Sequence, residues 1–471
     1  MIPYPAYKST NLPWLPKIPE HWGIVRCKQI FRPIDVRSEK GEEQLLSVSE
    51  RYGVVKREQA NVTMFKAASY EGYKLCWPDD LAINSLWAWS YGLGFSPYHG
   101  IISTAYSVFR LKDRTKYLPR FYDYLLRSKD FHWELRVRSK GLWKSRYQLS
   151  DDAFLAAPIL QIPVAEQEQI VRYLDSMTAK INKLIRAKKK QIALLQEQRQ
   201  AIINQAVTKG LAPNVEMKDS GQPRIGAIPR HWLLKEVKRM CRLQGGSGFP
   251  VEYQGNFSEC IPFIKVNSLS SHISTTRQYD TVSIETSKLL NAKIFSQGDI
   301  VFAKVGAALL LHRFEILPFD CCIDNNMMAM YNISENVYWL KYALSLLDFN
   351  DLVNPGAVPS ISQTQVGSLL IPCPPKSEQM EIVSHIEKHS SKINSLISRI
   401  EHSIDCLQEY KNSLISSVVT GQADVRNLPV EDVIPDDLIP DDAPTAEIEE
   451  DNPNDLNMDD EHNNLEVGQC S

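Results

Sequence analysis

The sequence lacks the features that define several common protein classes. No run approaches the ~18 uncharged apolar residues of a membrane helix. The N-terminus, MIPYPAYKSTNLPW, has no basic segment followed by an apolar one, so we expect no signal peptide. The nine cysteines are odd in number, and no two have C-x-x-C spacing. This pattern predicts reduced thiols in the cytoplasm, with neither a disulfide framework nor a zinc site.

Signatures of catalysis are also missing. The run GGSGFP at 245–250 lacks the lysine with which a phosphate-binding loop contacts its nucleotide. No Asn/Asp-Pro-Pro-aromatic run of adenine methyltransferases occurs, and NPGAVPS at 354–360 does not match it. The histidines are dispersed, without the spacing of metal ligands. The sequence therefore predicts a chain that is not an enzyme and binds no metal or cofactor itself.

Charge of both signs is present, but it is unevenly distributed. Residues 426–471 hold one basic and fifteen acidic residues, a net charge of −14, whereas the other 425 residues carry +11. The acidic segment is poor in aromatic residues, which predicts disorder. A basic body favours a polyanionic partner such as nucleic acid, although such a balance can also serve solubility alone.

The sequence contains an internal repeat. The segment KIPEHWGIVRCK at 17–28 recurs as AIPRHWLLKEVK at 227–238. Residues 163–208 align without a gap to residues 375–420, and seventeen of these 46 positions are identical. We interpret the chain as a tandem duplication, in which a globular part precedes a long helix in each copy. The tryptophans of the two IPxHW segments are expected to anchor packing.

The two predicted helices show the 4–3 apolar spacing that is typical of a coiled-coil seam. A proline-rich run precedes each helix, as expected of a helix start. The first helix leads away from the first globular part and the second returns, which favours an antiparallel pair over an extended rod or a dimeric coil. The predicted seam residues are Ile170, Leu174, Ile181, Ile192, Leu195, Ile382, Ile386, Ile393, Ile404 and Leu407.

The globular parts contain short β-branched and aromatic runs broken by Gly, Pro, Asn and Asp, which predict irregular β structure with a few helices. We therefore expect an α+β fold: two globular domains separated by two long helices packed as an antiparallel coiled coil, with the tandem repeat in a pseudo-two-fold arrangement. The expected boundaries are 1–162 for the first globular domain, 163–212 for the first helix, 213–374 for the second domain, 375–425 for the second helix and 426–471 for the acidic tail.

Several motifs together resemble those of the specificity subunits of type I restriction–modification enzymes. They are IPxHW in each half, LLSVSERYGVV at 45–55, DDLAINSLWAW at 79–89, GFSPYHGIISTAYSVFRL at 94–111, GDIVFAKVGA at 298–307, and EQxxIV at the start of each long helix. The resemblance covers the chain to about residue 425, and the acidic tail is not part of the family pattern.

The resemblance implies two target-recognition domains, each of which reads one half of a bipartite DNA site. The helices would set the spacer between the half-sites and dock two modification subunits, which bind S-adenosylmethionine and methylate adenine. Restriction subunits driven by ATP with Mg²⁺ join that core in some systems. The alternatives are a coiled-coil scaffold with two protein- or glycan-binding heads, and a self-sufficient methyltransferase or nuclease.

Candidate DNA contacts follow from local composition. The segment RVRSKGLWKSRY at 136–147 holds five cations and no acid, which favours phosphate contact over a merely solvated loop. In NSLWAWSYG at 84–92, the first two residues could contact base edges, whereas the tryptophans suit a core. The second domain offers GGSGFP and AKVGA, with plain turns as the alternative. The KKK run at 188–190 could contact spacer phosphates or form a solvated helix face.

The predicted DNA-binding residues are Asn84, Ser85, Arg136, Arg138, Lys140, Trp143, Lys144, Arg146, Lys188, Lys189, Lys190, Ser247, Lys265, Asn267 and Lys304.

Overall fold

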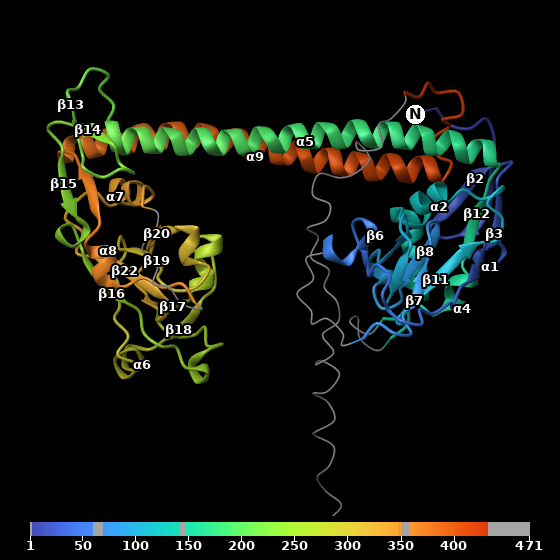
Figure 1. Ribbon diagram of the computed structural model, residues 1–471, viewed down its shortest axis with the longest axis horizontal. Helices are drawn as coiled ribbons and strands as arrows, with labels where there is room; N and C mark the ends of the chain where they lie inside the picture. The colour runs from blue at the N-terminus through green and yellow to red at the C-terminus, as the bar shows by residue number, and fades with distance from the viewer. Residues whose placement is uncertain (1, 60–68, 142–146, 348, 350–357, 432–471) are drawn as a thin grey trace, which may run out of the picture. The chain divides into compact units, whose positions relative to one another are not determined.

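The computed structural model describes residues 2–59, 69–141, 147–347, 349 and 358–431 (Figure 1). Three predicted DNA-binding residues, Trp143, Lys144 and Arg146, and most of the acidic tail lie outside these ranges. The chain divides into two compact units, unit 1 (Met1–Lys190 and Glu401–Ser471) and unit 2 (Gln191–Ile400). Within the described ranges, no helix is both long and apolar enough to cross a membrane.

Unit 1 is built on a four-stranded antiparallel sheet. Its strand order is β4 (Phe31–Pro33), β11 (Tyr106–Leu111), β8 (Asp80–Asn84) and β9 (Leu93–Phe95). All five residues of β8 are buried. Asp80 is buried because Arg110, its partner across the sheet, forms a bidentate ion pair with it at 2.6 and 2.7 Å. Such pairing compensates the cost of removing a carboxylate from water.

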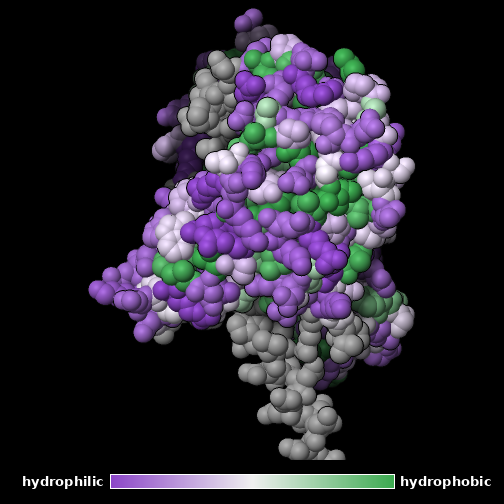
Figure 2. Space-filling model, turned by 90° about the vertical axis from the view of Figure 1, so that its right-hand side faces the viewer, coloured by the Kyte–Doolittle hydropathy of each residue, from purple (hydrophilic) through white to green (hydrophobic). Residues whose placement is uncertain are grey.

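Two-stranded pairs and short helices complete the head of unit 1. The pairs are β1 (Tyr7–Leu12) with β2 (Leu15–Pro19), β3 (Gly23–Arg26) with β12 (Pro158–Gln161), β5 (Leu46–Ser49) with β6 (Gly53–Lys56), and β7 (Lys74–Cys76) with β10 (Gly100–Ile102). The helices are α1 (Cys27–Ile30), α2 (Pro119–Leu126), α3 (Lys129–Arg138) and α4 (Asp151–Leu155). Figure 2 shows a mostly hydrophilic face with separate apolar patches.

Unit 2 contains a four-stranded antiparallel sheet with the corresponding strand order. It runs β16 (Arg242–Gly245), β22 (Met327–Tyr331), β19 (Ile300–Ala303) and β20 (Phe314–Ile316). A second sheet has the order β18 (Asp280–Val282), β17 (Ile261–Ile264) and β21 (Cys322–Ile323). The remaining elements are β13 (Met217–Asp219) paired with β14 (Ala227–Pro229), β15 (Leu233–Glu236) paired with β23 (Leu370–Cys373), α6 (Ile284–Leu289), α7 (Val337–Leu344) and α8 (Gln363–Gly367).

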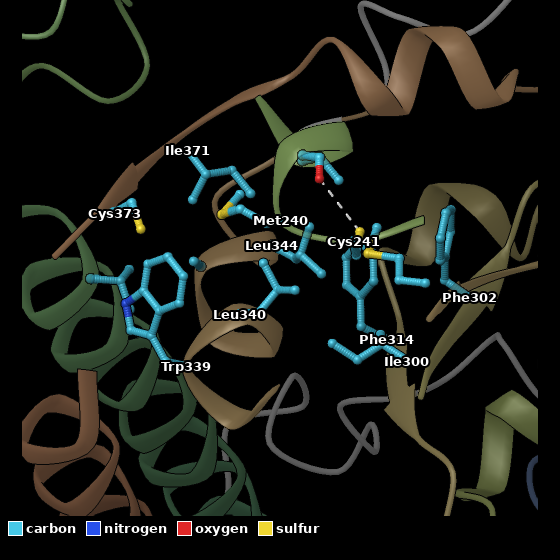
Figure 3. Packing of buried hydrophobic residues seen from close by; sticks show 14 of the residues in the cluster. Met240, Cys241, Ile300, Phe302, Phe314, Trp339, Leu340, Leu344, Ile371 and Cys373 are labelled. Atoms are coloured by element: carbon cyan, nitrogen blue, oxygen red, sulfur yellow. Dashed lines mark hydrogen bonds between the residues drawn. The ribbon is translucent and has the colours of Figure 1, made fainter. Parts of the chain in front are cut away.

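The main core of unit 2 joins the sheet to the long helices. Trp339 and Leu340 of α7 belong to the same buried cluster as Phe302 and Phe314 of the sheet, and Leu340 lies between Trp339 and Phe302 in the view of Figure 3. Burial raises the pKa of the Cys241 thiol to about 12, and its Sγ donates to the Val237 carbonyl at 3.5 Å. The same cluster includes residues of both long helices, namely Ile203, Ala206, Val207, Ile382, Val383 and Ile386. The helices are therefore part of the core of the unit.

The two long helices, α5 (Val164–Lys209) and α9 (Lys376–Val419), run antiparallel within each unit. In unit 1, Lys411 of α9 donates to Asn182 of α5 at 3.2 Å. In unit 2, Arg199 of α5 donates to Asn394 of α9 at 2.8 Å. Of the predicted seam residues, the buried ones are Ile170, Leu174, Ile181, Ile382, Ile386, Ile393 and Ile404, and the half-buried ones are Ile192, Leu195 and Leu407. Burying one such side chain contributes about 1.5–3 kcal/mol.

In unit 1, the IPxHW segment connects the start of α5 with the end of α9. His21 Nε2 lies 2.8 Å from Glu166 Oε2, and Tyr4 donates its hydroxyl to the other oxygen of Glu166 at 2.5 Å. Trp22 is fully buried beside Gly421, which follows α9 with φ +72°. A Cβ at Gly421 would lie 2.8 Å from the Trp22 ring, so this approach requires glycine.

In unit 2, the second IPxHW segment makes the corresponding connection between the start of α9 and the end of α5. His231 Nε2 lies 2.7 Å from Glu378 Oε1, and the buried Trp232 donates from Nε1 to Glu378 Oε2 at 2.9 Å. Gly210, with φ +72°, follows α5 against the Trp232 ring. Both tryptophans are fully buried, as the expected packing role requires.

A glutamine follows Glu166 and Glu378 in each copy, and it connects the long helix to the preceding head by hydrogen bonds. Gln167 accepts from the Leu118 amide at 2.9 Å and donates to the Lys116 carbonyl at 2.8 Å. Gln379 accepts from the Asn336 amide at 2.9 Å and donates to the Pro374 carbonyl at 3.0 Å. Leu118 and Asn336 are the N-cap residues of α2 and α7. Each glutamine thus joins the first turn of a long helix to the start of a head helix.

The two buried tryptophans form a matched pair for measuring how much the contacts of each IPxHW segment stabilise its unit. Trp232→Phe removes a hydrogen bond to a carboxylate, whereas Trp22→Phe removes an indole N–H that has no hydrogen-bond partner among the described residues. We expect Trp232→Phe to lower the free energy of unfolding of unit 2 by about 1–2 kcal/mol more than Trp22→Phe lowers that of unit 1. Urea unfolding followed by hydrogen exchange in each unit measures both, and equal losses would contradict the assignment.

Candidate nucleic-acid interface

The predicted contact segments of the two heads lie at one end of each four-stranded sheet. In unit 1 this end carries residues 85–92, which connect β8 to β9 and include a 3₁₀ turn at Ala88–Ser90. In unit 2 it carries residues 304–313, which connect β19 to β20 and include a 3₁₀ turn at Leu309–Leu311. The residue after each 3₁₀ turn, Tyr91 or His312, has a left-handed backbone conformation. The corresponding sheet ends thus carry loops of similar backbone shape.

In unit 1 the basic segment, residues 136–147, is held next to this end of the sheet by backbone hydrogen bonds. Lys140 and Gln148 exchange backbone hydrogen bonds at 3.0 and 2.9 Å. The Leu149 amide then donates to the Ser85 carbonyl at 2.9 Å, and the rings of Trp89 and Tyr147 lie 6.2 Å apart in an edge-on arrangement. The structure therefore brings together the two segments of the first domain that the sequence singled out.

Two of the predicted base-contacting side chains are buried. Asn84 is 6% exposed, and its Oδ1 accepts from the Leu86 amide at 3.1 Å. Ser85 is 5% exposed, and its Oγ lies 3.2 Å from Ser107 Oγ. In this structure both side chains hold the loop together and do not face solvent.

The described cations of the basic segment differ in their surroundings. Arg136 and Lys140 are exposed at the end of α3. Arg138 is paired with the buried Glu134, whose other oxygen accepts from Trp14 Nε1 at 2.9 Å. Because Arg138 compensates a buried carboxylate, it has a structural role that its two neighbours do not share.

In unit 2 three predicted segments meet around Asp324. The Ser247 amide donates to the Ile323 carbonyl at 3.0 Å, and the Lys304 amide donates to the Asn326 carbonyl at 2.8 Å. Asp324 accepts from the Val266 amide at 2.9 Å. Burial raises the pKa of Asp324, and the positive charges of Lys265 and Lys304 oppose that rise. The site is therefore a basic rim around one buried acid.

The lysines of this rim are not equivalent. Lys265 pairs with Asp280 at 2.6 Å and donates to Gln254 at 2.9 Å, so its ammonium is occupied within the unit. Lys304 is half-buried, and its ammonium lies beside Gly245, where an added Cβ would be 2.6 Å away. Asn267 is exposed. Lys304 is thus better placed than Lys265 to meet a ligand.

The sequence did not predict that the segment around Pro359 and Ile361 borders Lys304. The Gly306 amide donates to the Pro359 carbonyl at 2.8 Å, and the Ile361 amide donates to the Lys304 carbonyl at 3.0 Å. Val358 is 57% exposed at this position. The signal that could have found it is the Pro- and Gly-rich composition of residues 354–360, which is typical of a loop and does not match the methyltransferase motif.

The KKK run lies on α5 and not at a sheet end. Lys188 and Lys189 are half-buried and Lys190 is exposed. Across the described ranges, no group of three or more His, Cys, Asp or Glu side chains could hold a metal ion.

Two glycines offer a matched test of the unit 2 loop. A Cβ at Gly246 would lie 2.1 Å from the Asp324 carbonyl oxygen and 2.3 Å from that of Ile323, whereas a Cβ at Gly248 meets nothing within 4 Å. We expect Gly246→Ala to destabilise unit 2 by about 1–3 kcal/mol and Gly248→Ala to change stability by less than about 0.5 kcal/mol. Thermal unfolding of the two variants measures the difference, and a tolerated Gly246→Ala would show that the loop is not packed as described.

Comparison with known proteins finds a family model and curated relatives that are similar to this chain. Residues 229–405 match the model for the type I restriction modification DNA specificity domain. The chain is 25% identical over 273 residues to the putative type I restriction enzyme MjaX specificity subunit of Methanocaldococcus jannaschii. This alignment covers 56% of the chain and 59% of that relative. It is 19% identical over 323 residues to the type I restriction enzyme EcoDI specificity subunit of Escherichia coli, with 63% and 70% covered.

A solved structure shares the fold. It comes from a study of complex assembly and conformational transition of the type I restriction–modification system, and it matches with a TM-score of 0.62 at 16% identity. The match covers 86% of this chain and 99% of that one. The family model and the curated relatives confirm the resemblance predicted from the motifs: the chain is similar to the specificity subunits of type I restriction–modification enzymes.

Proposed function

We propose that this chain is the non-catalytic subunit that reads DNA sequence in a type I restriction–modification complex. Each head would read one half of a bipartite site. The observation that carries the proposal is the pair of sheets with corresponding strand order, each with a loop cluster and cations at the same end. The match of residues 229–405 to a DNA specificity domain supports it independently. Neither the family model nor these relatives support the alternative of a protein- or glycan-binding scaffold.

We infer that the chain is a tandem repeat in a pseudo-two-fold arrangement. The His–Glu contacts and the glutamine contacts at the start of each long helix support this, because they recur at equivalent positions of both copies. The domain boundaries follow the repeat: 1–162 and 213–374 for the target-recognition domains, 163–212 and 375–425 for the helices, and 426–471 for the tail. The helix pair would act as an antiparallel coiled coil that fixes the spacer, as dimer geometry fixes half-site spacing in other DNA-binding proteins.

The proposed contact residues fall into two groups. The exposed cations Arg136 and Lys140, with Trp143, Lys144 and Arg146 of the same segment, would meet phosphates of the first half-site. Ser247, Asn267 and Lys304 would do so in the second. The buried or paired residues Asn84, Ser85, Arg138 and Lys265 would position these loops, and Lys188, Lys189 and Lys190 would face the spacer.

Partners would dock on the helix pair. We propose two modification subunits, which would bring S-adenosylmethionine, and restriction subunits with ATP and Mg²⁺ in systems that have them. Apolar side chains that the helices leave exposed support this assignment, namely Leu184 and Tyr410 in unit 1 and Leu194 and Leu396 in unit 2. The complex would act on DNA in the cytoplasm.

Neutralising Arg136 and Lys140 tests the phosphate contacts. We expect the double variant Arg136→Gln, Lys140→Gln to bind all duplexes more weakly, because phosphate contacts carry no sequence information. The slope of log K against log salt should become shallower by about one for each phosphate that the variant no longer neutralises. The exposed Lys112 of the same unit provides the control Lys112→Gln. A salt slope that stays unchanged in the double variant would remove this segment from the interface.

Lengthening both helices tests the spacer. Seven residues added after Lys190 in α5 and seven after Ile400 in α9 would extend the pair by about 10 Å, at ~1.5 Å per residue. We expect the preferred spacer, selected from duplexes with randomised spacer length, to become longer by about three base pairs, since B-DNA rises about 3.4 Å per base pair. Inserting seven residues in α5 alone disrupts the pairing and serves as the control. Selection of the original spacer by the double insertion would contradict the role of the helices.

A further inference from the structure

After the end of α9, the chain stays packed against unit 1. Ala423 and Val425 are each 1% exposed, and the Asp424 amide donates to the Ile2 carbonyl at 2.8 Å. Gln169 of α5 then donates to the carbonyls of Val425 and Leu428, both at 3.1 Å. We call residues 421–431 the return segment, because they fold back over the first turns of α5.

The return segment follows α5 in the direction of its C-terminus. Its backbone meets Gln169 first, and Glu431 at its end pairs with Lys180 at 2.8 Å. Both partners of this pair are largely exposed, so the pair contributes little stability by itself. The pair marks the place on α5 that the chain has reached where the described residues end.

That place is the start of the most basic part of α5. Six cations occur within eleven residues, and no acidic residue occurs between Asp175 and Glu197. The six are Lys180, Lys183, Arg186, Lys188, Lys189 and Lys190. The part of α9 in unit 1 offers three acids, Glu401, Asp405 and Glu409, and one further cation, Lys411. Together with the six cations of α5 this leaves a surplus of four positive charges. We call the six cations of α5 the basic stretch.

The chain beyond Glu431 has the charge and the length to cover the basic stretch. Residues 432–471 contain fourteen acidic residues and no lysine or arginine. Five of these acids, Asp432, Asp436, Asp437, Asp441 and Asp442, fall within the first eleven residues. The basic stretch is about 15 Å long at ~1.5 Å per residue, which about five extended residues can span at ~3.3 Å each. Tethering this close to the target gives an effective concentration of the order of millimolar.

We propose that residues 432–442 dock on the basic stretch of α5 and compete there with DNA phosphates. The tail acts as an intramolecular polyanion that lowers binding to non-target DNA. A specific site displaces it, because the head contacts add to the phosphate contacts of the helix. The docking stands on the return segment and on charge, whereas its consequence for DNA rests on the proposed function.

The docking is tested without DNA by the reactivity of lysines in the full chain. Asp432, Asp436, Asp437, Asp441 and Asp442 are all changed to Asn, and acetylation rates are measured by mass spectrometry at low ionic strength. We expect Lys183, Lys188 and Lys190 to react several-fold faster in this variant. The exposed Lys112 of unit 1 and Lys288 of unit 2 should keep their rates. Unchanged rates on α5 would overturn the docking.

A matched control separates docking from net charge. Neutralising five acids further along the tail, Glu450, Asp451, Asp455, Asp459 and Asp460, removes the same charge from a part that the proposal does not place on α5. We expect this variant to leave the rates of Lys183, Lys188 and Lys190 near those of the unaltered chain. If it accelerated them as much as the first variant does, docking by residues 432–442 would be wrong.

The consequence for DNA is measured with a duplex of random sequence across a salt series. We expect the variant neutralised at 432–442 to bind about tenfold more tightly at low salt, with the difference vanishing as salt screens the charges. Faster acetylation with unchanged DNA affinity would overturn the competition. If no form of the chain bound DNA, the proposed function would fail, and the acetylation rates would still decide whether the tail docks.

Discussion

The rest of the structure depends on the contacts that one carboxylate makes at the first turn of each long helix. Glu166 and Glu378 are bound by a histidine of the IPxHW segment at 2.8 and 2.7 Å. The next residue, a fully buried glutamine, satisfies backbone groups of the head that precedes the helix. Acidic side chains at a helix N-terminus are also favoured by the helix dipole. Two adjacent side chains therefore fix the direction in which each long helix leaves its head.

The repeated motif is a junction between the two long helices. Each IPxHW segment contacts the start of one long helix through its histidine and the end of the other through its tryptophan. The junctions differ in one detail, because Tyr4 donates to Glu166 whereas Trp232 itself donates to Glu378. A motif that must meet the start of one helix and the end of the other at once explains why these few residues stay alike while the loops at the sheet ends have diverged.

The long helices could be predicted from sequence because their signal is local. The segments expected to be helical, 163–212 and 375–425, enclose α5 (Val164–Lys209) and α9 (Lys376–Val419). Seven of the ten seam residues are buried, and the other three are half-buried near the middle of the helices. The strand order of the sheets could not be predicted, because it joins segments such as β4 and β11 that are far apart in sequence.

The candidate site was harder to predict than the fold. The basic composition of residues 136–147 indicated a surface segment, but composition cannot tell that Arg138 compensates the buried Glu134 while Arg136 and Lys140 face solvent. The burial of Asn84 and Ser85 depends on Ser107 and on the base of the basic segment, which come from elsewhere in the chain. Exposure is a tertiary property, so residue type alone could select candidate segments but could not tell which of their side chains face solvent.

The central claim is that two heads fixed to one helix pair read two half-sites at a set distance. Mapping N6-methyladenine across the DNA of cells that express this chain with the proposed modification subunit tests it most directly. The account predicts a single bipartite motif whose two halves differ in sequence and are separated by a spacer of constant length. A continuous motif, or two half-sites methylated at variable separations, would contradict it.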